Sequence, residues 1–117
     1  MAPDMKQLST HILDMVRGKP AVNVPVRLEK QNPSGDWRVL NSARTDADGR
    51  CSQLLPETEN LSGVYRLVFD TGNYYSQQQC DTLYPEVEIT FLARDGESHF
   101  HIPLLLSPNG YTTYRGS

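Results

Sequence analysis

Clusters of turn-forming residues divide this 117-residue chain into short segments. Gly, Pro, Asn, Asp and Ser gather at residues 32–36, 46–49, 70–73 and 107–110, among other places. Segments of this length are typical of β-strands and are too short for most helical bundles. The spacing of the turns therefore predicts an all-β sandwich.

Three segments, residues 24–29, 64–70 and 86–91, alternate apolar and polar side chains with the period of two that a half-buried strand requires. In the last of them, Val87, Ile89 and Phe91 share one face. Residues 75–83 lack this alternation and carry several glutamines, so we expect one short helix there. The pattern predicts a two-sheet sandwich with one helix, in a single domain spanning residues 1–117.

Composition and charge exclude several classes of function. Fourteen acidic residues against eleven Lys and Arg give a net charge of −3, which offers no electrostatic basis for binding nucleic acid or anionic lipid. No apolar run approaches the ~20 residues of a membrane span. The first residues do not resemble a secretory signal, so we expect a cytoplasmic protein in which Cys51 and Cys80 are reduced.

The segment 98–114 contains no Asp, Glu, Lys or Arg, yet it holds three consecutive leucines at 104–106. Three leucines in a strand place apolar groups on both faces, whereas a two-sheet sandwich covers only one face of each sheet. We therefore expect a homo-oligomer in which the outward face of this C-terminal hairpin is buried between subunits.

The three histidines are the candidate reactive groups. His99 and His101 are two positions apart in an expected strand and therefore share a face, while Phe100 points to the other side. Together with His11 they could form a zinc site with an open fourth position. The metal-free alternative uses a neutral imidazole as general base, with an arginine stabilising the developing oxyanion. The residue pattern leaves both open.

Four motifs carry a resemblance to a known family. They are Leu-Ser-Thr-His-Ile-Leu-Asp at 8–14, Thr-Asp-Ala-Asp-Gly-Arg at 45–50, His-Phe-His-Ile-Pro-Leu-Leu-Leu-Ser-Pro at 99–108 and Tyr-Arg-Gly-Ser at 114–117. Over nearly the whole chain they resemble the transthyretin-like 5-hydroxyisourate hydrolases. Two positions depart from the common pattern: Phe100 stands where many members carry Tyr, and Asp46 where Asn is frequent.

The resemblance implies an eight-strand sandwich that assembles into a homotetramer, with the active sites in a channel at the dimer–dimer interface. It also implies a small purine-derived substrate and no metal or cofactor. Water would open the six-membered ring of 5-hydroxyisourate to give 2-oxo-4-hydroxy-4-carboxy-5-ureidoimidazoline, in the breakdown of urate toward allantoin.

Carried over by motif, the resemblance assigns catalysis to His11, Arg50 and His101, and substrate binding to His99, Tyr114, Arg115, Gly116 and Ser117. We take His11 as the base and His101 as a hydrogen-bonding partner, although the two could exchange tasks. Arg50 would lower the histidine pKa and pair with the developing negative oxygen. The alternatives are a small-molecule carrier on the same scaffold, a zinc-dependent cyclic amide hydrolase and a purely structural module.

Overall fold

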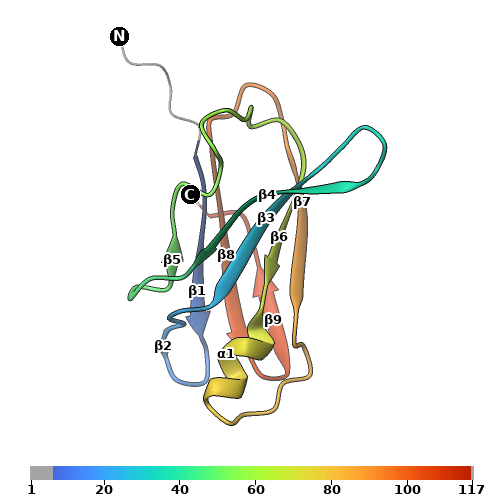
Figure 1. Cartoon of the computed structure of the whole chain (residues 1–117). Coiled ribbons are helices and arrows are strands. Elements are labelled where there is room, and N and C mark those ends of the chain that lie inside the picture. The colour runs from blue at the N-terminus through green and yellow to red at the C-terminus, as the bar shows by residue number, and fades with distance from the viewer. Residues whose placement is uncertain (1–6, 117) are drawn as a thin grey trace.

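The computed structural model describes residues 7–116, which form two β-sheets packed face to face and one helix (Figure 1). The first sheet has the order β2-β1-β8-β9, and β5 also pairs with β1. The second has the order β4-β3-β6-β7. The predicted two-sheet all-β sandwich is confirmed. The strands are β1 (Gln7–Asp14), β2 (Lys19–Pro20), β3 (Pro25–Gln31), β4 (Trp37–Arg44), β5 (Arg50–Cys51), β6 (Gly63–Phe69), β7 (Val87–Ala93), β8 (His99–Ser107) and β9 (Gly110–Thr113).

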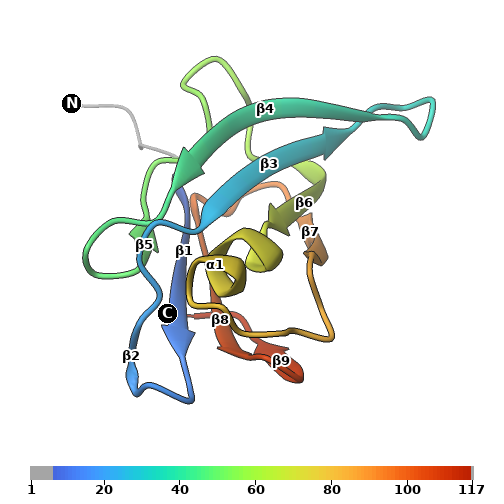
Figure 2. The same ribbon diagram turned by 60° about the horizontal axis from the view of Figure 1, so that its bottom comes forward.

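The core lies between the two sheets, which Figure 2 shows as separate layers. The predicted alternation holds in β6, where Tyr65, Leu67 and Phe69 are fully buried. In β1 every second residue is buried, so its other face is left half-buried and outward. Burying these apolar faces is the main driving force that holds the sheets together.

The C-terminal hairpin of β8 and β9 has the predicted two-sided character. Leu104 and Leu106 are fully buried in the core, whereas Leu105 is only half-buried on the outward face. Leu105 lies opposite Leu13 of the parallel neighbour β1. The outward face of the first sheet therefore has an apolar part as well as polar side chains.

The helix α1 spans Thr71–Gln77, so the sequence-based placement at residues 75–83 was wrong. Asp70 caps the helix, because its side chain accepts a hydrogen bond of 3.0 Å from the backbone N–H of Asn73. Tyr74 and Tyr75 are buried and fix the face that α1 turns to the core. The cluster at 70–73 is therefore a helix start. Within residues 7–116, no helix has the length and apolarity needed to cross a membrane.

Asp14, at the end of β1, connects this strand to α1. Its buried carboxylate accepts a 2.6 Å hydrogen bond from the hydroxyl of Tyr74. It also accepts backbone N–H bonds from Val16 and Arg17, which order the turn after β1. Burial, followed by the hydrogen bond to Asp14, raises the pKa of Tyr74, so the phenol stays protonated and donates.

The outward face of the second sheet carries a satisfied ionic cluster. The carboxylate of Glu29 is buried between the guanidinium groups of Arg27 and Arg66, and Arg66 lies 4.2 Å over the ring of Trp37. Burial alone would raise the pKa of Glu29, but the hydrogen bonds and charges of the two arginines outweigh it and hold this pKa below its usual value. The charges of Glu29, Arg27 and Arg66 are therefore already paired with one another.

Candidate active site

Strand pairing brings His11, Arg50 and His101 to the outward face of the first sheet. His11 lies directly opposite Arg50 in the antiparallel pair of β1 and β5. On its other side β1 runs parallel to β8, with Ser9 opposite His101. Because Ser9 and His11 are two residues apart in one strand, all four side chains share one face. The three residues assigned to catalysis therefore lie on one face of neighbouring strands, although they are distant in sequence.

The turn before β5 holds Arg50 at this position. One carboxylate oxygen of Asp46 accepts hydrogen bonds from the backbone N–H groups of Asp48 and Arg50, at 2.9 and 3.0 Å. These bonds lower the pKa of Asp46, and the positive charge of Arg50 lowers it further. The turn is therefore braced by a carboxylate that remains ionised at neutral pH.

Gly49 lets this turn pack directly on β1. Its φ is +74°, and a Cβ at this position would lie 2.6 Å from the carbonyl oxygen of Ile12. The backbone N–H of Ile12 donates to the carbonyl of Gly49 at 2.8 Å. A glycine is thus required for the close approach that sets Arg50 beside His11.

His101 is held from both sides. The hydroxyl of Ser9 lies 2.8 Å from Nδ1 of the imidazole. On the other side the backbone N–H of Gly116 donates to the carbonyl of His101 at 2.7 Å, and a Cβ on Gly116 would come within 2.5 Å of ring atom Cδ2. The Nδ1 edge of the ring therefore faces Ser9 and the Cδ2 edge faces Gly116, so the ring atoms farthest from the backbone, including Nε2, point away from the sheet.

The surroundings of His101 favour its neutral form. Burial of the ring lowers the pKa of His101 below its usual value. The positive charge of Arg50 lowers this pKa further, as do the imidazoles of His11 and His99. This is the direction expected from a neighbouring arginine, but burial is the larger cause. A neutral imidazole near pH 7 can accept a proton or donate a hydrogen bond.

The other residues assigned to substrate binding are distributed over two faces. His99 is exposed on the same face of β8 as His101. Gly116 touches His101, as described above. The guanidinium of Arg115, however, lies 4.4 Å from the ring of Phe100, which faces the core. Arg115 and Tyr114 both line a groove between β7 and β9. Ser117 lies outside the described residues.

Two other chemistries, metal ligation and a cysteine nucleophile, depend on the side chains around the histidines. Among residues 7–116, no three His, Cys, Asp or Glu side chains form a group that could hold a metal ion. Cys51 follows Arg50 but faces the core as a free thiol. Burial, followed by the charge of Asp46, raises the pKa of Cys51 to about 11, so it is not a thiolate at neutral pH.

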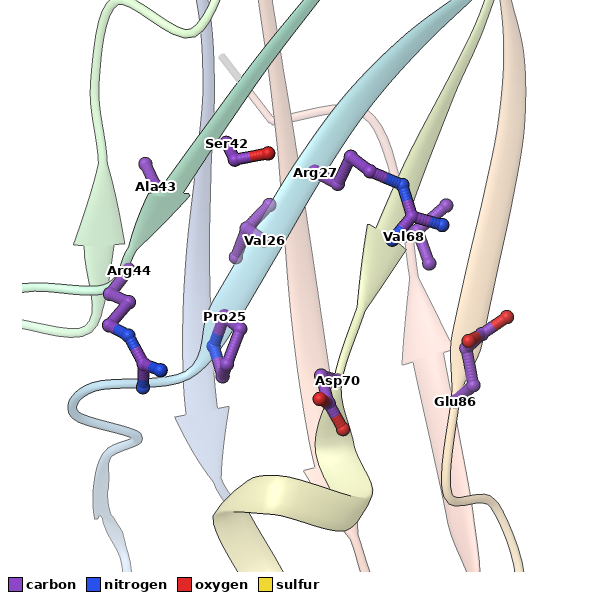
Figure 3. A pocket seen from close by; sticks show the side chains of 9 residues that line it. All are labelled: Pro25, Val26, Arg27, Ser42, Ala43, Arg44, Val68, Asp70 and Glu86. Carbon is purple, nitrogen blue, oxygen red and sulfur yellow. The ribbon is translucent and has the colours of Figure 1, made fainter. Parts of the chain in front are cut away.

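A separate groove of about 620 Å³ lies on the second sheet and contains none of the predicted site residues (Figure 3). Arg27 and Arg44 line it, together with the carboxylates of Asp70 and Glu86. Its charges are mixed, and Arg27 is already paired with Glu29. The histidine face is therefore the better candidate for chemistry.

Ser9, whose hydroxyl contacts the imidazole of His101, was not singled out by the sequence analysis. Its position two residues before His11 places it on the histidine face of β1, and this signal was available in the sequence. Its pairing with His101 depends on the register between β1 and β8, which no local pattern reveals.

Two imidazoles and a guanidinium on one water-accessible face can perform a hydrolysis. A neutral imidazole can take a proton from water, and a second can hold the water or the substrate. A guanidinium can stabilise the negative charge that develops on a carbonyl oxygen. The arrangement therefore fits attack of water on the carbonyl group of a small polar molecule.

Comparisons of the sequence with known proteins match one family. The model of the HIUase/Transthyretin family matches residues 8–116. A 5-hydroxyisourate hydrolase from Salmonella typhimurium is 47% identical over 110 residues, covering 94% of this chain and 80% of that protein. The mouse 5-hydroxyisourate hydrolase is 42% identical over 118 residues and is matched over its full length.

Solved structures show the same likeness. The 5-hydroxyisourate hydrolase of Klebsiella pneumoniae has a TM-score of 0.84 at 35% identity, covering 97% of this chain and 100% of that one. A sea bream transthyretin in complex with thyroxine has a TM-score of 0.88, also at 35% identity, with 93% of each chain covered. The same fold therefore occurs in a 5-hydroxyisourate hydrolase and in a transthyretin crystallised with thyroxine.

Proposed function

The chain belongs to the HIUase/Transthyretin family, and on this premise we propose that it is a 5-hydroxyisourate hydrolase. The observation that supports this function is that strand register puts His11, Arg50 and His101 on one outward sheet face. A carrier needs shape and apolar contact but has no need for a neutral imidazole beside a guanidinium. The hydrolase assignment therefore accounts for these residues better than ligand carriage does.

The chemical step uses the pair of His11 and Arg50. His11 takes a proton from water as the hydroxide forms a bond to a carbonyl carbon of the six-membered ring. The carbonyl oxygen becomes negative and is stabilised by Arg50. The tetrahedral intermediate then collapses, the ring C–N bond breaks, and the imidazolium returns the proton to the leaving nitrogen. Water is consumed, and the enzyme ends in its starting protonation state.

His101 holds the water or a substrate oxygen beside this pair. If the Ser9 hydroxyl donates to Nδ1, the proton of the neutral ring lies on Nε2, which then donates outward. The opposite tautomer would make Nε2 an acceptor and allow His101 to exchange tasks with His11. Either tautomer needs the neutral ring that burial and Arg50 favour.

We also propose that this single domain acts as a homotetramer in the cytoplasm, with the histidine faces of two dimers meeting to enclose the substrate. The half-buried Leu13 and Leu105 on this face support the proposal, because a second copy would remove them from water. The edge strands β7 and β9 also support the proposal. Within the described residues each pairs with only one strand, so its other edge is free to pair with a second copy.

The test is ultraviolet monitoring of freshly generated 5-hydroxyisourate, with spontaneous decay as the baseline and parallel reactions with and without EDTA. We expect decay to accelerate with enzyme and to be unaffected by the chelator. Saturable binding without turnover would instead identify a carrier on this scaffold. Activity lost with EDTA and restored by zinc would identify a zinc-dependent hydrolase.

A further inference from the structure

We propose that Glu97, in the loop between β7 and β8, is a positioning residue that clamps the C-terminal segment through Arg115 and so keeps Gly116 against His101. The inference rests on the proposed function, because it assigns Glu97 a part in assembling that site. The carboxylate of Glu97 accepts hydrogen bonds from Arg115, and the proposed effect passes through this pair.

Arg115 is held by three contacts, which are with a carboxylate, a backbone carbonyl and an aromatic ring. Its two terminal guanidinium nitrogens approach the two carboxylate oxygens of Glu97 at 3.3 and 3.2 Å. One of them also approaches the carbonyl oxygen of His99 at 3.4 Å. The guanidinium lies 4.4 Å from the ring centroid of Phe100, within the range of a cation–π interaction. The planar guanidinium of Arg115 is thus held at its edge by Glu97 and at its face by the ring of Phe100.

Holding Arg115 in place also restricts the next residue in the chain, Gly116. Gly116 continues the ladder of β9 at the position opposite His101, after two residues, Tyr114 and Arg115, that leave the ladder. A single isolated bridge after such a break is weak by itself, because one hydrogen bond must order several backbone dihedrals. The clamp on Arg115 supplies the missing constraint and holds Gly116 over the Cδ2 edge of the imidazole.

The exposure of the pair sets the size of the effect. The side chains of Arg115 and Glu97 are 52% and 37% exposed, so the ion pair is screened by water and salt. Substituting Glu97 should therefore weaken the clamp without unfolding the protein. Substituting Arg115 removes the ion pair, the aromatic contact and the bond to the His99 carbonyl together, so its effect should be larger.

The experiment compares Glu97→Gln, Arg115→Gln and the double variant with the intact protein. We expect Glu97→Gln to lower kcat/KM about two- to fivefold, mainly through kcat, which is the size that one exposed ion pair supports. Arg115→Gln should cost about tenfold or more, and the double variant should be no worse than Arg115→Gln alone. Glu59→Gln, which removes an ion pair with Arg38 on the second sheet, is the matched control and should leave kcat/KM unchanged.

Two readouts need no catalysis. Hydrogen exchange of the Gly116 amide should accelerate in Glu97→Gln, and NMR titration should show the pKa of His101 rising as the segment that covers the ring loosens. A rise in ionic strength to about 1 M should bring the intact protein toward the Glu97→Gln values. These measurements test the clamp even if the intact protein does not hydrolyse 5-hydroxyisourate, so the two proposals fail separately.

Three results would overturn the clamp. The first is a Glu97→Gln variant with unchanged kcat/KM and unchanged Gly116 exchange. The second is a double variant whose loss is the product of the two single losses, because independent effects mean that the residues do not act through one another. The third is an Arg115→Gln variant that raises KM alone with Gly116 still protected, which would show direct contact of Arg115 with substrate.

Discussion

The hydroxyl of Ser9 lies 2.8 Å from Nδ1 of His101, so a residue of β1 fixes the orientation of an imidazole on β8. The two residues are register partners in the parallel pair. An imidazole that is free to rotate would present either ring nitrogen to a substrate. Ser9 removes this freedom, and the predictions below start from this contact.

Ser9→Ala should lower kcat/KM about two- to tenfold, the range that corresponds to the loss of one neutral hydrogen bond. Ser9→Thr retains a hydroxyl and should recover most of the activity. Steady-state kinetics of both variants, with ¹⁵N NMR of the His101 ring, measure the effect on rate and on tautomer. Equal activity of Ser9→Ala and the intact protein would show that the contact does not orient the ring.

His11→Ala and Arg50→Ala should each lose at least about two orders of magnitude in kcat/KM while still folding. General-base catalysis contributes about 10²- to 10⁴-fold, and an oxyanion donor contributes about 3–4 kcal/mol. Circular dichroism checks the fold. Arg44→Ala, an exposed arginine on β4, is the matched control and should retain activity. Losses below tenfold in both site variants would remove the roles assigned to these residues.

Gly116→Ala should reduce kcat/KM about a hundredfold with little change in stability. A Cβ there would lie 2.5 Å from Cδ2 of His101, so the ring or the segment must shift, and a displacement of about 1 Å can cost that much. Gly110→Ala is the matched control, because its Cβ would meet nothing closer than the Ser107 hydroxyl oxygen at 3.7 Å. A fully active Gly116→Ala enzyme would contradict the close contact.

Titration of His101 should show a pKa below about 6.5, the usual value for histidine. A lower pKa leaves more of the imidazole neutral at a given pH, so the acid limb of kcat/KM should extend to lower pH than an unperturbed histidine would allow. Arg50→Gln should raise this pKa, because it removes a positive charge, but only part of the way, since burial remains. An unchanged His101 titration in Arg50→Gln would show that the guanidinium is too distant to act.

Two adjacent tyrosines should respond oppositely to loss of the hydroxyl. Tyr74→Phe removes the donor to Oδ2 of the buried Asp14 carboxylate, whose Oδ1 keeps its bonds from Val16 and Arg17, and should lower the free energy of unfolding by about 1.5–3 kcal/mol. The Tyr75 hydroxyl is buried with no hydrogen-bond partner among the described residues, so Tyr75→Phe should be neutral or stabilising. Urea unfolding of both variants measures the difference, and equal destabilisation would contradict the assigned bonding.

The parts of the fold that follow from periodicity were predictable from sequence. The two-residue alternation located the apolar faces of β3, β6 and β7, and the run Leu104–Leu106 indicated that β8 carries apolar side chains on both faces. The helix was placed too late, because Asp70 looks the same in a turn and as a helix cap until its side chain is seen to bond to Asn73.

Only part of the candidate site could be predicted from the sequence. The alternation of side chains along a strand placed His99 and His101 on one face, and the motifs identified His11 and Arg50. The bond from Ser9 and the direction of Arg115 depend on how distant segments pair, namely on the register of β1 with β8 and on the break after β9. Local sequence carries no information about either, so these features needed coordinates.

The parallel pairing of β1 with β8 has a consequence for biosynthesis. Ser9 and His101 are separated by 92 positions, so at a translation rate of about 5–20 residues per second the first strand waits roughly 5–20 s for this neighbour. During that interval one edge of β1 is open to other nascent chains and to chaperones. His101 can therefore join His11 and Arg50 on this face only after β8 has left the ribosome, so the candidate site assembles late in synthesis.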